Sequence, residues 1–130
     1  MQIEKQFSIF LINRPGVLAH ITGLLTENGI NVQALSLSDS GEHGVLRIVC
    51  QDVDKARACL TEAHDRWTET DVLVIPIDNT PGGFSRLAKT LTDGGADIAY
   101  AYFSAADDGK ATTAVFKIKD LEAAKALLEG

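Results

Sequence analysis

The sequence contains two copies of one pattern, and this internal repeat limits the possible folds more than any other feature. Residues 13–18, NRPGVL, align with residues 79–84, NTPGGF, at an offset of 66. The same offset places LTENGI at 25–30 over LTDGGA at 91–96, and an offset of 68 places Asp52 over Asp120. A matched series of turns and apolar positions indicates a tandem duplication. The chain of 130 residues therefore divides into two small domains, residues 1–70 and 71–130.

Each half shows the same order of elements: strand, helix, strand, strand, helix. In the first half, a β-rich run at 7–12 precedes apolar residues at helical spacing from Val17 to Leu25. Strands at 30–38 and 45–50 and a helix after Asp52 follow. The second half repeats this order with strands at 72–77, 98–104 and 113–118 and helices that begin near Phe84 and after Asp120. This order predicts an α+β fold of two ferredoxin-like βαββαβ units in tandem, with antiparallel sheets and helices on one face.

The segment that joins the halves predicts a strand common to both. Residues 66–70 continue into 71–75 without a glycine or proline that would reverse the chain. The second half ends after its last helix, so we expect domain 71–130 to lack its own last strand. Residues 72–77 would then form an open sheet edge, where Pro76 is tolerated. We expect either a partner chain or the other half of the same chain to cover this edge. Because two-fold self-pairing is the commonest solution, we expect a homodimer.

Composition excludes several classes of partner. Eighteen acidic against twelve basic residues give a net charge of −6, which argues against nucleic acid as a partner. The sequence predicts no membrane span and no secretory signal. Two cysteines, Cys50 and Cys59, cannot form a disulfide framework, which is typical of a cytoplasmic protein.

The sequence carries no catalytic or nucleotide-binding motif. There is no HExxH, GxSxG, Walker A or GxGxxG pattern. His20, His43 and His64 lie more than twenty residues apart, which is typical of solvated surface histidines. We therefore expect no enzymatic activity, no cofactor and no metal site.

The two turns, together with ENGINV at 27–32 and its weaker copy DGGADI at 93–98, resemble the ACT domain family. The resemblance covers nearly the whole chain and is closest to stand-alone tandem ACT proteins. It implies a regulatory protein that binds a free amino acid or a related metabolite. Carried over by position, it assigns ligand contacts to Asn13, Arg14, Pro15, Gly16, Val17, Leu18, Asn31 and Val32 in the first half, and to Asn79, Thr80, Gly82, Gly83, Phe84, Asp97 and Ile98 in the second.

The start of the first helix offers a physical basis for such a site. The N–H groups of Gly16, Val17 and Leu18 lack intrahelical partners and lie at the positive end of the helix dipole, where a carboxylate is favoured. The same motif also has a purely structural explanation, because proline suits the first turn of a helix.

The second turn departs from the first at three positions. Threonine, glycine and aspartate at 80, 83 and 97 stand where the first half has arginine, valine and asparagine. We therefore expect the first turn to be the stronger site.

Two other functions share this fold. One is a module for protein interaction or oligomerisation that has lost its ligand. The other is the regulatory subunit of an amino-acid biosynthetic enzyme, such as acetolactate synthase, which would bind both a metabolite and an enzyme partner. A binding screen of the twenty amino acids distinguishes the first alternative, and co-purification with a large subunit distinguishes the second.

Overall fold

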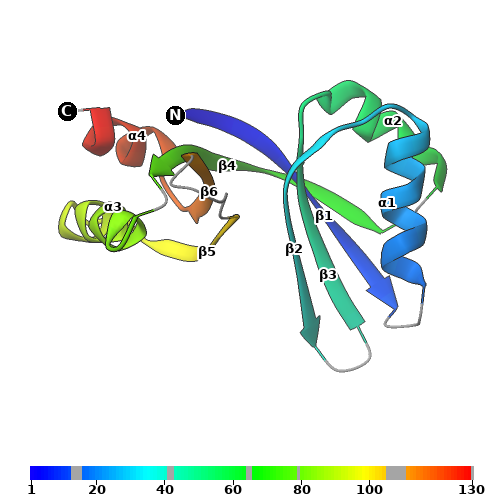
Figure 1. The fold of residues 1–130 in the computed structure, drawn as a ribbon, viewed down its shortest axis with the longest axis horizontal. Coiled ribbons are helices and arrows are strands. Elements are labelled where there is room, and N and C mark those ends of the chain that lie inside the picture. The colour runs from blue at the N-terminus through cyan, green and yellow to red at the C-terminus, as the bar shows by residue number, and fades with distance from the viewer. Residues whose placement is uncertain (13–15, 41–42, 64–65, 79, 105–110, 130) are drawn as a thin grey trace. The chain divides into compact units, whose positions relative to one another are not determined.

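The computed structural model describes residues 1–12, 16–40, 43–63, 66–78, 80–104 and 111–129 (Figure 1). The chain forms two compact units. The first unit is Lys5–Thr70, and the second unit combines Asp71–Gly130 with Met1–Glu4. The first four residues therefore belong with the second half of the sequence.

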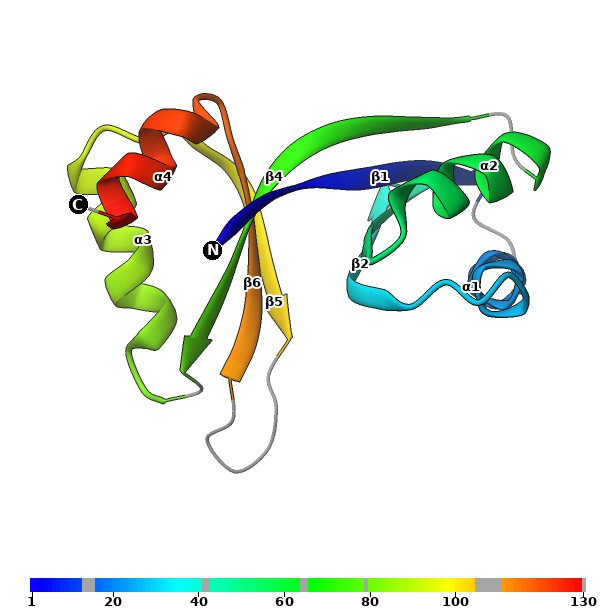
Figure 2. The ribbon, with the colours of Figure 1, turned by 90° about the horizontal axis from the view of Figure 1, so that it is seen from above.

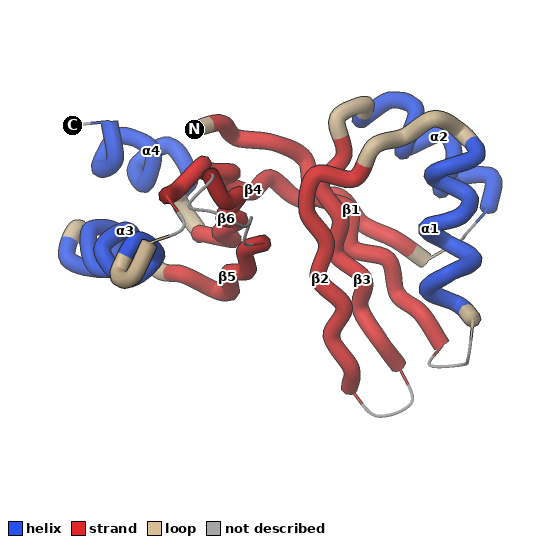
Figure 3. The backbone as a smooth tube through the Cα atoms, in the orientation of Figure 1, coloured by secondary structure: helices blue, strands red, loops and turns tan. Residues whose placement is uncertain are grey.

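The first unit has the element order predicted for each half. Its elements are β1 (Gln2–Ile12), α1 (Val17–Glu27), β2 (Val32–Ser40), β3 (His43–Cys50), α2 (Val53–Ala63) and the beginning of β4 (Trp67–Asp78). The strand order is β2-β3-β1-β4, and β3 is antiparallel to both β1 and β2. The helices α1 and α2 lie on one side of these strands (Figure 3).

The second unit repeats this arrangement. It consists of the end of β4, α3 (Gly83–Asp93), β5 (Ile98–Ser104), β6 (Ala111–Ile118) and α4 (Leu121–Glu129), together with the beginning of β1. The strand order is β1-β4-β6-β5, and β6 is antiparallel to both β4 and β5. Both helices lie on one side of the strands (Figure 2). The predicted α+β fold of two tandem ferredoxin-like units is confirmed.

Two long strands contribute residues to both units. The continuous strand β4 confirms the prediction that the join between the halves is extended. Residues 72–77 do not lie at a sheet edge, because β4 lies between β1 and β6. Of the two predicted ways to cover this strand, the structure has the one in which the other half of the same chain covers it. The beginning of β1 takes the position of the fourth strand, which the second half of the sequence does not supply. The open edge can therefore no longer support the expected homodimer.

Each unit has its own hydrophobic core between its strands and its two helices. In the first unit, Phe7, Ile9 and Leu11 of β1 pack with β3 and both helices. Trp67 packs edge-to-face on Phe7, with ring centroids 5.7 Å apart. The core of the second unit contains Leu73, Ile75, Leu91, Ala114, Phe116, Ile118 and Ala124. Met1 and Ile3 pack against this second core, which explains why the beginning of β1 belongs to that unit.

We expect Ile3→Ala to destabilise the second unit, because the substitution removes apolar contacts between β1 and its core. A fully buried isoleucine costs about 2–5 kcal/mol when it is truncated to alanine, and we expect about 1–2 kcal/mol for this partly buried one. Urea unfolding measures the loss, and amide hydrogen exchange should show faster exchange in β6 than in β3.

The matched control is Gln2→Ala, because Gln2 is exposed on the same strand. An equal loss of stability at positions 2 and 3 would contradict the assignment of β1 to the second core.

Candidate functional site

Each N-x-P-G turn leads into a helix through a glycine in the left-handed conformation. Gly16 precedes α1 with φ 86°, and Gly82 precedes α3 with φ 84°. Glycine has no side chain that could cap the N–H groups of the first helical turn. Both helices therefore begin with backbone donors that are available to an anionic group.

The second turn is closed by backbone hydrogen bonds. The N–H of Thr80 donates to the Asp78 carbonyl (2.9 Å), and the N–H of Gly83 donates to the Thr80 carbonyl (3.1 Å). A Cβ atom at position 83 would lie 2.7 Å from the Asp78 carbonyl oxygen, so this turn requires glycine there. The first repeat has Val17 at the equivalent position, where its side chain packs against the core.

A cavity of about 360 Å³ adjoins the second turn. We call it the turn cavity, and its lining includes Thr80, Gly82, Phe84, Ser85, Phe103 and Thr112. Phe84 stacks on Phe103 and on Phe116, with ring centroids 5.0 and 5.4 Å apart. The lining of the cavity therefore combines aromatic side chains with the start of a helix.

The turn cavity contains a buried hydroxyl, that of Thr112. Thr112 is 3% exposed, and its Oγ1 has no hydrogen-bond partner among the described residues. Thr112 lies opposite Ile77 in the register of β4 and β6, so its side chain is on the sheet face that bears the helices. A buried hydroxyl without a partner costs about 1–3 kcal/mol, and a bound polar group would remove this cost.

These groups suit a small ligand with a polar head. The first intrahelical bond near the turn is donated by the N–H of Arg86 to the Gly82 carbonyl (2.9 Å). The N–H groups of Phe84 and Ser85 lie within this first turn, at the positive end of the helix dipole. They favour a carboxylate, while Thr112 can donate to or accept from a second polar atom.

Several predicted ligand contacts cannot be placed. Residues 13–15 and 79 lie outside the described part of the chain, so the contacts predicted for Asn13, Arg14, Pro15 and Asn79 stay predictions. Gly16 and Leu18 are exposed at the start of α1. The large cavity of the first unit, about 620 Å³, is lined by residues such as Phe10, His43 and Trp67 and by none of Gly16, Val17 and Leu18.

The predicted contacts at the start of the second strand do not meet the turn within either unit. In Figure 1, α1 runs from the end of β1 toward the start of β2, so Asn31 and Val32 lie at the opposite end of the helix from Gly16. The N–H of Gln51 donates to the Asn31 carbonyl (3.3 Å). In the second unit, Asp97 and Ile98 are separated from Gly82 in the same way by α3.

Sequence reasoning missed two lining residues of the turn cavity, Phe103 and Thr112. A signal for Thr112 was present, since a polar residue stands at an inward position of an otherwise apolar alternation, ATTAVFKI. Phe103 gave no such signal, because an aromatic residue in a strand is equally consistent with core packing.

The cysteines and histidines do not form a chemical site among the described residues. No group of three His, Cys, Asp or Glu side chains in the described ranges could hold a metal ion. Both cysteines are buried, and burial, with a smaller effect of Cys59, raises the pKa of Cys50 to about 11. Its thiol is therefore protonated at neutral pH, which agrees with the role of an apolar filler.

The four helices have at most 11 residues in their described parts, and none is long and apolar enough to span a membrane.

The architecture is that of two ferredoxin-like units, and comparisons with known proteins agree. A profile of the family described as "ACT domain pair" matches residues 1–129. The chain belongs to this family of ACT domain pairs.

Solved structures share the fold over almost the whole chain. Protein BT0572 from Bacteroides thetaiotaomicron is 31% identical, with a TM-score of 0.88 over 98% of this chain and 87% of that one. The ligand-free regulatory subunit of aspartate kinase from Thermus thermophilus is 17% identical, with a TM-score of 0.71 over 98% and 93%. The corresponding subunit from Thermus flavus is 18% identical, with a TM-score of 0.62 over 98% and 90%. The curated protein sequences contain no match.

We expect Thr112→Val to stabilise the ligand-free protein, because valine replaces a buried, unpartnered hydroxyl with a methyl group of similar size. The expected gain in the free energy of unfolding is about 1 kcal/mol, measured by urea unfolding. Thr113→Val is the matched control, since Thr113 is half-buried on the opposite face of the same strand. A loss of stability in Thr112→Val would show that the hydroxyl has a partner.

We expect Gly16→Val to destabilise the first unit by about 1–2 kcal/mol, because a side chain at φ 86° strains the backbone although no atom lies within 4 Å of its Cβ. This substitution therefore cannot block the turn without cost to the fold. Gly23→Ala, inside α1 and equally uncrowded, should instead gain about 0.5–1 kcal/mol in the same urea experiment. Equal effects at both positions would contradict the left-handed conformation of Gly16.

Proposed function

We propose that this protein is a regulatory module that binds a free amino acid in the turn cavity of its second unit and catalyses no reaction of its own. The observation that supports this most strongly is the buried, unpartnered hydroxyl of Thr112 beside the start of α3. Membership of the ACT domain pairs agrees with a regulatory role.

The proposed ligand uses the three kinds of group that line the cavity. Its carboxylate accepts from the N–H groups of Phe84 and Ser85 at the start of α3. The Thr112 hydroxyl binds the ammonium group as an acceptor. The side chain of the ligand packs against Phe103, which is 50% exposed and gains apolar contact on binding.

The proposed output of binding is regulation of a separate enzyme. Two of the solved structures with this fold are regulatory subunits of aspartate kinase. By analogy, we propose that this chain acts on an enzyme of amino-acid metabolism. Co-purification of that enzyme with the tagged full chain from native cells would support this part of the proposal.

A thermal scan against the twenty amino acids tests the binding function. Binding to the folded state alone adds about 2.7 kcal/mol at a ligand concentration one hundred times Kd. For a domain of this size the melting temperature then rises by about 5–10 °C. Thr112→Val should abolish this rise, because it removes the only hydroxyl at the buried end of the cavity that the described residues provide.

The control for this scan is Thr113→Val, which should keep the full temperature shift. If none of the twenty amino acids changes the melting temperature, the chain is instead an interaction module without a ligand. If a shift persists in Thr112→Val, the amino acid binds elsewhere.

We also propose that the protein is a homodimer, now on the basis of one of its outer strands. Leu35 and Leu37 of β2 are 42% and 49% exposed. β2 is the outer strand of the first unit, so a second copy can cover these apolar side chains.

Light scattering should give twice the chain mass of 13.9 kDa, and Leu37→Asp should reduce it to the monomer value. A monomer mass for the unchanged protein at millimolar concentration would exclude this assembly.

A further inference from the structure

The cavity of about 620 Å³ in the first unit lies on the face of the sheet that points away from both helices. We call it the open-face cavity. Its volume is within the range of about 300–1,000 Å³ that is typical of small-molecule sites. Strands β1, β3 and β4 contribute to its lining, together with Arg66 directly before β4. Because it lies outside the core, the packing of the unit does not account for the side chains that line it.

The alternation along β1 places an aromatic side chain in this cavity. Ile9 and Leu11 are buried in the core between strands and helices, so Phe10 between them points to the opposite face. There it remains 43% exposed. In the register of β1 and β3, Phe10 lies opposite Val45, which also lines the cavity. The two side chains form an apolar pair on a face that no helix covers.

A cation lies beside this apolar pair. Trp67 packs against the core, so Arg66 and Thr68 on either side of it in sequence belong to the opposite face. The N–H of Phe10 donates to the Arg66 carbonyl (2.9 Å), which makes these two residues neighbours across the sheet. Arg66 forms no ion pair with the described residues. Its guanidinium is therefore available to an anion next to the Phe10 ring.

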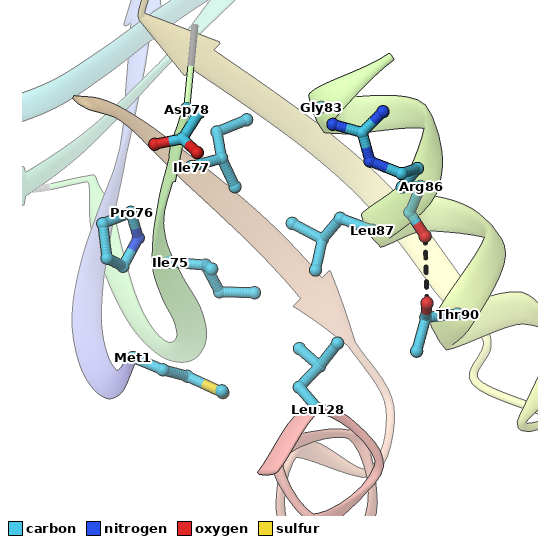
Figure 4. Close-up of a pocket in the computed structure, with 10 residues that line it drawn as sticks. All are labelled: Met1, Ile75, Pro76, Ile77, Asp78, Gly83, Arg86, Leu87, Thr90 and Leu128. Atoms are coloured by element: carbon cyan, nitrogen blue, oxygen red, sulfur yellow. Dashed lines mark hydrogen bonds between the residues drawn. The ribbon is translucent and has the colours of Figure 1, made fainter. Parts of the chain in front are cut away.

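The second repeat does not keep the apolar pair. In the register of β4 and β6, Pro76 lies opposite Thr113, at the positions equivalent to Phe10 and Val45. Figure 4 shows Pro76 pointing away from Leu87 of α3, which is the corresponding face of the second unit. The same fold thus forms without an aromatic residue at this position. The exposed pair is a particular property of the first unit.

The charge of the lining limits which ligand the cavity can take. None of the described lining residues is acidic, although the chain as a whole has a net charge of −6. Arg66 attracts an anion, and an ammonium group in the same place would have no counter-charge. The lining therefore favours a ligand that is apolar and negatively charged over one that is cationic or zwitterionic.

We propose that the open-face cavity binds an apolar carboxylate that carries no amino group. The carboxylate accepts hydrogen bonds from the Arg66 guanidinium, and the Thr68 hydroxyl supplies a further donor. The aromatic or alkyl body of the ligand packs on Phe10 and Val45 and removes their exposed surface from water. The open-face cavity shares no lining residue with the turn cavity, so this proposal does not depend on the function proposed above.

Titration of 4-phenylbutanoate into the full-length protein, followed by amide chemical shifts, tests the proposal. We expect saturable shifts at Phe10, Val45 and Thr68, with a Kd of about 1 mM. Arg66→Gln should weaken binding by about fivefold or more, because it removes the partner of the carboxylate. Arg66→Lys keeps the charge and should stay within about threefold of the unchanged protein. Phe10→Ala should weaken binding by about fivefold or more, because the ligand loses its aromatic contact.

Three relatives of this probe separate the contributions of charge and apolar contact. The alcohol 4-phenylbutan-1-ol has the same apolar body without a charge, and 4-phenylbutylamine carries the opposite charge. L-Homophenylalanine is 4-phenylbutanoate with an α-amino group. Each should bind about fivefold or more weakly than 4-phenylbutanoate, because none offers Arg66 a carboxylate free of a neighbouring ammonium group.

The matched control is Lys55→Gln, which removes one positive charge from the exposed surface of α2 in the same unit and should leave Kd unchanged within about twofold. Because Arg66 is exposed, its variants should keep the fold, which an unchanged amide spectrum of α2 would verify. Thr112→Val should not alter these shifts, so failure of the turn cavity and failure of this site give different results.

Three results would overturn the proposal. The first is the absence of saturable shifts at Phe10, Val45 and Thr68 up to about twenty times the expected Kd. The second is equal affinity for 4-phenylbutanoate and 4-phenylbutan-1-ol, which would show a merely apolar surface of the kind that a protein partner covers. The third is unchanged affinity in Arg66→Gln, or tighter binding of L-homophenylalanine than of 4-phenylbutanoate.

Discussion

Strands β1 and β4 are the constraint on which the rest of the structure depends. Each is a single uninterrupted strand, and each contributes hydrogen-bonding and packing positions to both compact units. A βαββαβ unit needs four strands to cover its two helices, but two tandem copies of this sequence supply only six strands in total within the described residues. Both units still have four strands, because β1 and β4, at 11 and 12 residues, are each long enough to take part in both. The second unit is consequently discontinuous in sequence, and its core includes Met1 and Ile3.

Much of this fold could be predicted from the sequence because its signals are local. Apolar spacing located the four helices, and the uninterrupted run through Thr70 located the continuous strand β4. The position of the beginning of β1 could not be predicted in this way. Its partner strand lies about seventy residues away in sequence, and nothing in the first four residues indicates which core they join.

The candidate site shows the same limit of prediction from local sequence signals. The turns were visible as motifs, whereas the cavity depends on Thr112 and Phe103, which only the sheet register brings to the turn.

The two repeats have diverged in opposite directions. The first unit fills its core with Val17, Leu24 and Trp67, and the second leaves the corresponding space open. Sequence comparison of the turns alone favoured the first copy, because it keeps the arginine and asparagine of the motif. The turn cavity favours the second copy, because its lining brings the Thr112 hydroxyl to the start of α3.

The alternation of side chains along the two long strands limits how this protein can change its length during evolution. Along β1, the residues that face a helical layer are Met1, Ile3, Phe7, Ile9 and Leu11, and along β4 they are Trp67, Leu73, Ile75 and Ile77. All of these positions are odd, so the phase of the alternation does not change at the boundary between units. Insertion or deletion of one residue near Glu4 or Thr70 would turn every later side chain of that strand to the opposite face. A change of two residues would keep the alternation, whereas a change of one would need a compensating β-bulge, such as the register shift between Val32 and Ala34 of β2.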